Sequence, residues 1–167
     1  GKLALYDYCK SRGIPFKRCG KMIVATNKNQ IENLKALQKK AVANGVTDLI
    51  WQDKKATLEM EPALNAMASL LSPSTGIIDS HALMLSYQGE AEANGAVIAF
   101  NTPVLSGKTT DSAILLHIGG ETPMTVKSKF VFNCGGLNAQ KIAASIIGFP
   151  DKYVPETHYA KGNYFSL

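Results

Sequence analysis

An apolar run interrupted by two adjacent glycines, FVFNCGGLNAQKIAASIIG at residues 130–148, is the feature that most constrains the fold of this chain. Phe130 to Asn133 predicts a buried strand, Gly135 and Gly136 a tight turn, and Asn138 to Ile147 a helix. A strand, a glycine turn and a helix in this order are the parts of a phosphate-binding site. The third glycine of the GxGxxG spacing is missing, so a purely conformational role for the two glycines stays open.

Four further helices are predicted upstream of this run. Polar capping residues begin three of them, and glycine or proline ends most of them. Their predicted extents are Leu3 to Ser11, Asn27 to about Asn44 with Gly45 after it, Asp53 to Glu61-Pro62, and Asp79 or Ser80 to Asn94 with Gly95 after it.

Short strands are predicted between the helices. A strand pair is expected from 14–17 and 21–26, turning at Cys19-Gly20, and a hairpin from 113–118 and 124–126 around Gly119-Gly120. The other predicted strands are 48–51, 68–72, 97–100, 104–105 and about 159–167. Long helices mixed with hairpins, without strict alternation, predict an α+β fold with an incomplete α/β portion.

The composition excludes several classes of protein. With 167 residues, of which 46% are apolar, the chain can bury a core without disulfide or metal staples. The net charge of +5 is dispersed, and no basic run exceeds two residues, as at Lys39-Lys40, so a nucleic-acid-binding stripe is not expected. The three cysteines show no metal-ligand spacing, and no apolar stretch approaches the roughly 20 residues that span a bilayer.

Catalytic constellations are scarce. His81, His117 and His158 have no partner at catalytic or metal-ligand spacing, and Glu59 and Glu61 diverge on a helix. No metal site and no catalytic residue are predicted from these side chains.

The C-terminal stretch HYAKGNYFSL is richer in polar groups. It gathers His158, Tyr159, Lys161, Asn163 and Tyr164 around one glycine, as a pocket for a carboxylate substrate would. An ordinary exposed edge strand explains the same pattern equally well.

Several stretches together resemble one family. LYDYCKSRGIPFKRCGKMIVAT, LEMEP, SPSTGIIDSHALM, AEANGA, FVFNCGGLNAQKIA and YAKGNYFSL are similar, in that order, to the middle of the L-2-hydroxyglutarate dehydrogenases. These are FAD-dependent oxidoreductases of the D-amino-acid-oxidase-like group. The resemblance covers essentially the whole chain.

The resemblance implies oxidation of L-2-hydroxyglutarate to 2-oxoglutarate, with a hydride leaving C2 for the flavin of FAD and the electrons passing to an acceptor such as quinone. It also implies cofactor contacts from the Val104 backbone and from Cys134, Gly135 and Gly136. Lys161 or Tyr164 would meet a substrate carboxylate. The eukaryotic members imply a mitochondrial location, with the bacterial cytoplasm or membrane periphery as the alternative.

The domains implied by the resemblance are the first part of a substrate domain with a mixed sheet and helices (1–100), a partial FAD-binding domain (101–148) and a return into the substrate domain (149–167). The family's N-terminal βαβ unit with GxGxxG has no counterpart in this sequence. We therefore expect a fragment that lacks FAD and activity by itself, with an exposed sheet edge that favours self-association.

Two alternatives stay open. The chain is a stand-alone substrate-lobe module for binding or interaction, or it belongs to an FAD-dependent enzyme for another small acid or alcohol, such as glycine, sarcosine or glycerol 3-phosphate.

Overall fold

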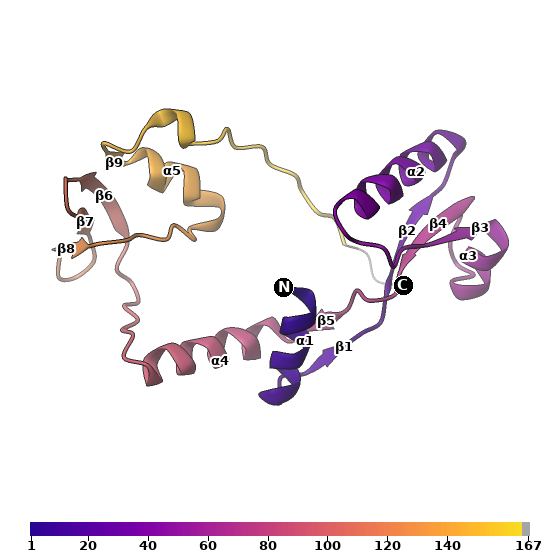
Figure 1. Cartoon of the computed structure of the whole chain (residues 1–167), viewed down its shortest axis with the longest axis horizontal. Coiled ribbons are helices and arrows are strands. Elements are labelled where there is room, and N and C mark those ends of the chain that lie inside the picture. Colours follow the sequence, from indigo (N-terminus) through magenta and orange to yellow (C-terminus); the bar gives the residue numbers. More distant parts are fainter. Residues whose placement is uncertain (165–167) are drawn as a thin grey trace. The chain divides into compact units, whose positions relative to one another are not determined.

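The computed structural model describes residues 1–164. The chain divides into two compact units, Gly1–Val97 and Ile98–Leu167. Figure 1 identifies their elements by label and colour. The three-part domain division stays a prediction.

Three helices of unit 1 begin where the sequence predicts, because side-chain caps fix their first turns. Asn27 accepts a hydrogen bond from the Gln30 amide at 3.1 Å and starts α2 (Lys28–Ala43). Asp53 caps α3 (Lys54–Met60) and Asp79 caps α4 (Ser80–Ala93) in the same way, at 2.8 and 2.9 Å. The first helix, α1, spans Lys2–Ser11.

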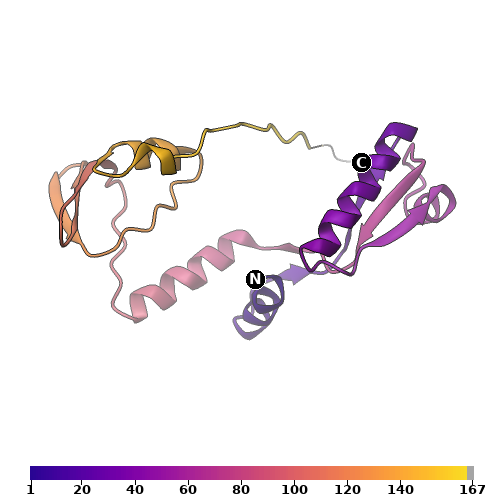
Figure 2. The same cartoon turned by 45° about the horizontal axis from the view of Figure 1, so that its top comes forward.

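A three-stranded antiparallel sheet carries the core of unit 1. Its order is β2 (Lys21–Ala25), β4 (Ala68–Ser72), β3 (Ile50–Asp53). The register places Ile23, Leu70 and Trp51 side by side on one face. Helix α2 covers this face, and Leu34 packs there against Ala25 and the fully buried Leu70. Figure 2 shows α2 lying along the sheet.

Buried hydroxyl groups link α3 to the opposite face of this sheet. Thr57 and Ser69 are both fully buried, and their hydroxyl oxygens lie 2.9 Å apart. The Ser69 hydroxyl also lies 2.9 Å from the Gln52 side-chain oxygen. Because each buried hydroxyl has a partner, the usual cost of burying polar groups is offset.

Two sets of contacts join the first residues of unit 1 to its last residues. The short strands β1 (Phe16–Lys17) and β5 (Ile77–Ile78) pair antiparallel. The hydroxyl of Tyr8 on α1 bonds Ser86 and Glu90 on α4, at 2.8 and 3.0 Å. Arg12 forms an ion pair with the same Glu90.

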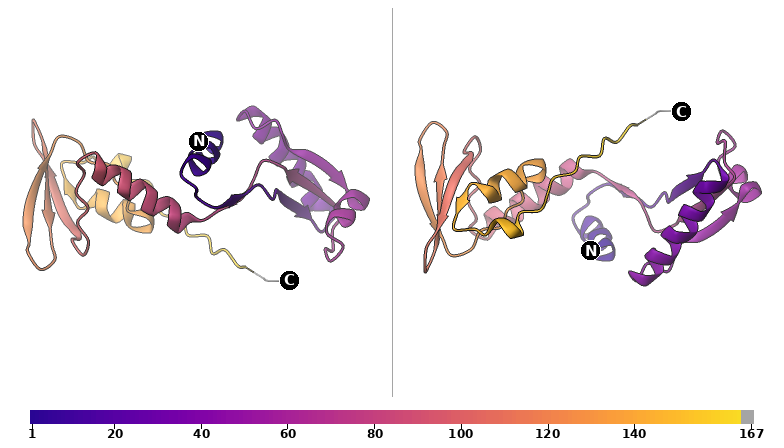
Figure 3. Two further views of the ribbon diagram at one scale, coloured as in Figure 1. Left: turned by 90° about the horizontal axis from the view of Figure 1, so that it is seen from below. Right: turned by 90° about the horizontal axis from the view of Figure 1, so that it is seen from above.

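Unit 2 is built around a four-stranded sheet with the order β8 (Met124–Ser128), β7 (Ile114–Ile118), β6 (Val104–Thr109), β9 (Ile146–Ile147). The predicted hairpin is confirmed as β7 and β8, and Gly120 adopts a φ of +106° in its turn. A 3-10 turn, η1 (Gly136–Asn138), leads into α5 (Ala139–Ala144), and η2 spans Asp151–Tyr153. Figure 3 shows α5 beside the sheet from two directions.

The predicted pairing of 14–17 with 21–26 is wrong. Strand β1 pairs with β5, and β2 pairs with β4. The Gly20 amide donates to the Thr75 carbonyl at 2.9 Å, so the turn is fastened to a distant segment and the two strands do not close on each other. Tertiary contacts override the local hairpin signal here.

Three other strand predictions fail in the described residues. Residues 97–100, 130–133 and 159–164 form no strand, and 165–167 lie outside the described part of the chain. Phe130 and Phe132 are 79% and 88% exposed. An apolar run becomes a strand only when a neighbouring strand pairs with it, and within residues 1–164 none pairs with 130–133.

The predicted helix 138–147 is also too long. Helix α5 ends at Ala144, and Ile146–Ile147 pairs in parallel with Gly107 and Lys108 of β6. The Ser145 hydroxyl donates to the Ile142 carbonyl at 2.8 Å and so satisfies a terminal helix acceptor. The two β-branched isoleucines then suit a strand better than a helix.

Candidate functional site

The glycine turn of unit 2 is held by the side chain of Asn133. The side-chain oxygen of Asn133 accepts from the Gly135 amide at 3.1 Å, and its amide nitrogen donates to the Ala139 carbonyl at 2.7 Å. The Asn138 amide closes the turn on the Gly135 carbonyl at 3.0 Å. Three hydrogen bonds therefore define the path of residues 133–139.

The two glycines of this turn serve different purposes. A Cβ added to Gly135 would lie 2.5 Å from the Ile142 side-chain end and 3.1 Å from the Asn133 side-chain oxygen. A Cβ added to Gly136 would meet nothing within 4 Å, but Gly136 has a φ of +55°. Gly135 thus makes room for α5, while Gly136 leaves open space on the outside of the turn.

The backbone at Gly136 therefore faces open space, and Gly135 fits internal packing. Cys134 is exposed beside them. Phe132 and Leu137, on either side of the turn, are 88% and 76% exposed. Exposed large apolar side chains around an accessible backbone turn are typical of a binding surface.

Val104, the first residue of β6, lines a cavity of about 310 Å³. This cavity brings Val104 together with Asn138, at the end of the glycine turn, and with Ile142 of α5. Cys134, Gly135 and Gly136 do not line it. The structure therefore places Val104 near the end of the turn but does not gather all four residues around one cavity.

Lys161 and Tyr164 lie on an irregular segment after η2, within unit 2. Both side chains are exposed, Tyr164 to 97%. Their predicted approach to a substrate carboxylate stays a prediction.

The three histidines lie on separate elements, His81 on α4, His117 on β7 and His158 after η2. His117 lies 3.2 Å from the Thr125 hydroxyl across the β7–β8 hairpin, and His158 lies 3.8 Å from Glu156. Across residues 1–164, no three His, Cys, Asp or Glu side chains gather as a metal site would require. Nor is any helix in that range both apolar and long enough to cross a bilayer.

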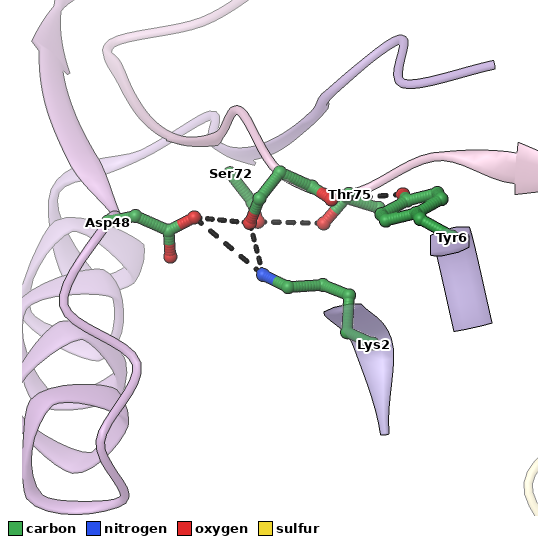
Figure 4. A network of polar contacts seen from close by, with 6 residues as sticks. Lys2, Tyr6, Asp48, Ser72 and Thr75 are labelled. Carbon is green, nitrogen blue, oxygen red and sulfur yellow. Dashed lines mark hydrogen bonds and ion pairs between the residues drawn. The ribbon is translucent and has the colours of Figure 1, made fainter. Parts of the chain in front are cut away.

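A polar network in unit 1 surrounds the Asp48 carboxylate and displaces its pKa (Figure 4). The Asp48 carboxylate accepts from the Ser74 hydroxyl and faces the Lys2 ammonium at 3.7 Å. The Ser74 hydrogen bond lowers the pKa of Asp48 below 3.8, and the Lys2 charge lowers it further. The Tyr6 hydroxyl donates to the Ser74 carbonyl at 3.0 Å and attaches α1 to the same turn.

Sequence reasoning missed Asn133 and Ile142. An asparagine two residues before a glycine is a known signal for a side-chain-stabilised turn, so Asn133 could have been found. The contact between Ile142 and Gly135 depends on how α5 folds back, which no local pattern shows.

The whole chain matches one family. Residues 2–167 match the family model described as FAD dependent oxidoreductase. L-2-hydroxyglutarate dehydrogenase of Arabidopsis thaliana is 33% identical over all of this chain and 40% of its own length. The human protein of the same name is 28% identical over all of this chain and 41% of its own length. The chain thus spans about two fifths of the length of these relatives.

Solved structures agree with this match. L-α-glycerophosphate oxidase of Mycoplasma pneumoniae, a structure with FAD bound, is 27% identical with a TM-score of 0.73, over 87% of this chain and 39% of that one. Glycine oxidase of Geobacillus kaustophilus has a TM-score of 0.66 at 23% identity, over 86% of this chain and 39% of that one, and supports the fold. The α+β fold and the resemblance predicted from the sequence are confirmed, and the chain belongs to the family of FAD-dependent oxidoreductases.

Proposed function

We propose that the full-length protein containing this chain oxidises L-2-hydroxyglutarate to 2-oxoglutarate with FAD as cofactor. The observation that carries the proposal is the similarity of the entire chain to relatives named L-2-hydroxyglutarate dehydrogenase. The open space beside the Gly136 backbone supports a cofactor-binding role for the turn.

Within unit 2, we assign cofactor contacts to the backbone of Val104 and to the turn at Cys134, Gly135 and Gly136. The Gly136 backbone faces open space and would lie closest to the dinucleotide, while Gly135 supports it by allowing α5 to pack beneath. FAD, when bound, supplies the electron acceptor for oxidation of the substrate. The role of the turn is to bind the cofactor and to orient it.

Lys161 and Tyr164 are the proposed substrate contacts. A lysine ammonium and a tyrosine hydroxyl both donate hydrogen bonds to carboxylates, and L-2-hydroxyglutarate has two carboxylates. The exposure of both side chains leaves them available to a ligand. Electrons would pass from the flavin to an acceptor such as quinone, and the names of the eukaryotic relatives support a mitochondrial location.

The 167-residue chain alone should be inactive. It spans about two fifths of its relatives, and the two phenylalanines of its run 130–133 are exposed, with no strand pairing to this run among residues 1–164. We propose that the rest of the full-length protein supplies the partner segments that complete the dinucleotide site. The exposed phenylalanines of this run also favour self-association of the isolated chain.

Purified full-length protein provides the test. We expect a flavin absorbance spectrum between roughly 350 and 500 nm and reduction of that flavin by L-2-hydroxyglutarate but not by the D-enantiomer. The 167-residue chain, assayed in parallel, should show neither. A full-length protein without flavin would refute the proposal.

A related enzyme function is the second candidate, because the structural neighbours include a glycerophosphate oxidase and a glycine oxidase. The same reduction assay with glycine, sarcosine and glycerol 3-phosphate separates the substrates. Faster flavin reduction by one of these than by L-2-hydroxyglutarate would replace the proposed substrate.

A stand-alone binding module is the third candidate. It requires the 167-residue chain to be monodisperse and to bind 2-hydroxyglutarate without flavin. Calorimetry that detects no binding would remove this candidate.

A further inference from the structure

We propose that Asn133 is a positioning residue for the cofactor, which it serves by holding the glycine turn in its binding conformation before the cofactor arrives. This inference rests on the proposed function. Asn133 is not itself one of the assigned cofactor contacts, but its side chain fixes the backbone of the turn that carries three of them.

The geometry of Asn133 connects the two ends of the turn. Its side-chain oxygen accepts from the Gly135 amide two residues ahead at 3.1 Å. Its side-chain nitrogen donates to the Ala139 carbonyl, at the start of α5, at 2.7 Å. One side chain therefore spans the whole turn, including Gly136.

The turn needs such support because its backbone is intrinsically adaptable. Gly135 and Gly136 are adjacent, and glycine has the largest conformational freedom of any residue. Gly136 must keep a φ of +55° for its open side to face outward. Without the two Asn133 hydrogen bonds, the turn would lose conformational entropy when FAD binds. The affinity for FAD would therefore fall.

Three variants of the full-length protein separate this role from ordinary stability. Asn133→Ala removes both hydrogen bonds, and Asn133→Ser retains a weaker acceptor for the Gly135 amide without the reach to Ala139. Thr110→Ala is the matched control in the same unit. The Thr110 hydroxyl also holds a turn through two hydrogen bonds. It donates to the Ala113 carbonyl at 2.9 Å and accepts from the Ala113 amide at 3.1 Å.

Two measurements are made on each variant: the FAD dissociation constant, by titration of the cofactor-free protein, and hydrogen exchange of the Gly135 amide without FAD. We expect Asn133→Ala to raise the dissociation constant roughly tenfold and to speed the exchange of the Gly135 amide. Asn133→Ser should be intermediate in both. Thr110→Ala should leave both near the wild-type values.

Other results would overturn either the positioning role of Asn133 or the proposed function. If Asn133→Ala speeds exchange while its dissociation constant equals that of Thr110→Ala, the residue is only structural and the inference fails. If Asn133→Ala does not fold, Asn133→Ser decides, and an unchanged dissociation constant with faster exchange overturns the inference. A wild-type protein that binds no FAD refutes the proposed function and this inference with it.

Discussion

The Tyr8 hydroxyl donates a hydrogen bond to the Glu90 carboxylate at 3.0 Å and so joins the first helix of unit 1 to the last. The same hydroxyl lies 2.8 Å from the Ser86 hydroxyl, and the Tyr8 ring lies 4.9 Å from the Tyr87 ring. The α1–α4 contact is therefore partly polar and partly aromatic.

Replacing Tyr8 by Phe should lower the free energy of unfolding of unit 1 by about 1 kcal/mol, because the hydroxyl contacts are lost while the ring is kept. Denaturant titration followed by Trp51 fluorescence measures this, since Trp51, on β3, is the single tryptophan of the chain. Tyr87→Phe is the control, because it keeps the ring that contacts Tyr8 and removes only the Tyr87 hydroxyl. An equal loss in both variants would contradict a specific role for the Tyr8 hydroxyl.

Asp48 should make unit 1 sensitive to acid. Its pKa is lowered below 3.8 in the folded state, chiefly by the Ser74 hydrogen bond, so its contribution to stability is present above that value and lost as the pH falls through the folded pKa. Ser74→Ala should raise the pKa of Asp48 toward 3.8, as an NMR titration of the carboxyl would show. In Asp48→Asn the same acid-side loss of stability should be absent. An unchanged pKa in Ser74→Ala would rule out the hydrogen bond as the main cause.

Gly135→Ala should destabilise unit 2 by about 1–3 kcal/mol, because the new methyl group would overlap the end of Ile142. Ile142→Val removes the clashing carbon and alone should cost about 0.5–1.5 kcal/mol. In the Gly135→Ala background the same change should instead recover stability. Thermal unfolding of the four proteins in this cycle gives the coupling, and simple additivity would disprove the packing role of Gly135.

Gly136→Ala should cost about 1 kcal/mol for a different reason, the positive φ alone. Gly136→Asn should cost less, because asparagine tolerates the left-handed region better than alanine. Unfolding measurements that rank alanine above asparagine in stability would contradict this account.

Leu70→Ala should lower the free energy of unfolding of unit 1 by about 2–5 kcal/mol, because Leu70 is fully buried and packs with Ala25 and Leu34. Leu37→Ala on α2, where the side chain is 39% exposed, should cost much less. Trp51 fluorescence in denaturant compares the two. Similar losses of stability in the two variants would contradict a core of unit 1 centred on Leu70.

Local signals predict α2, α3 and α4 well because residues near the ends of a helix close it. Asn27, Asp53 and Asp79 each cap the helix that follows within three residues, and the sequence alone contains that relationship. The β7–β8 hairpin was predictable for the same reason.

Strand pairing depends on residues far apart in the sequence, so local patterns predict strand partners less well than helix ends. Lys17 pairs with Ile77, and Ala25 with Ala68, so no local pattern identifies either partner. The run at 130–133 has the composition of a buried strand but pairs with none in residues 1–164. At the glycine turn the sequence identifies the residue types, but the different roles of Gly135 and Gly136 depend on how α5 folds back against the turn.

The contacts of α1 also bear on the order of folding. Tyr6 and Tyr8 find their polar partners 68 and 82 residues later in the chain, so a ribosome would release α1 long before Ser74 and Glu90 emerge. Contacts of such high sequence separation slow folding, whereas the β6–β7–β8 meander connects neighbouring strands. During translation α1 would therefore lack its partners until nearly the whole of unit 1 is synthesised. In that interval its apolar surface would be exposed and open to binding by a chaperone.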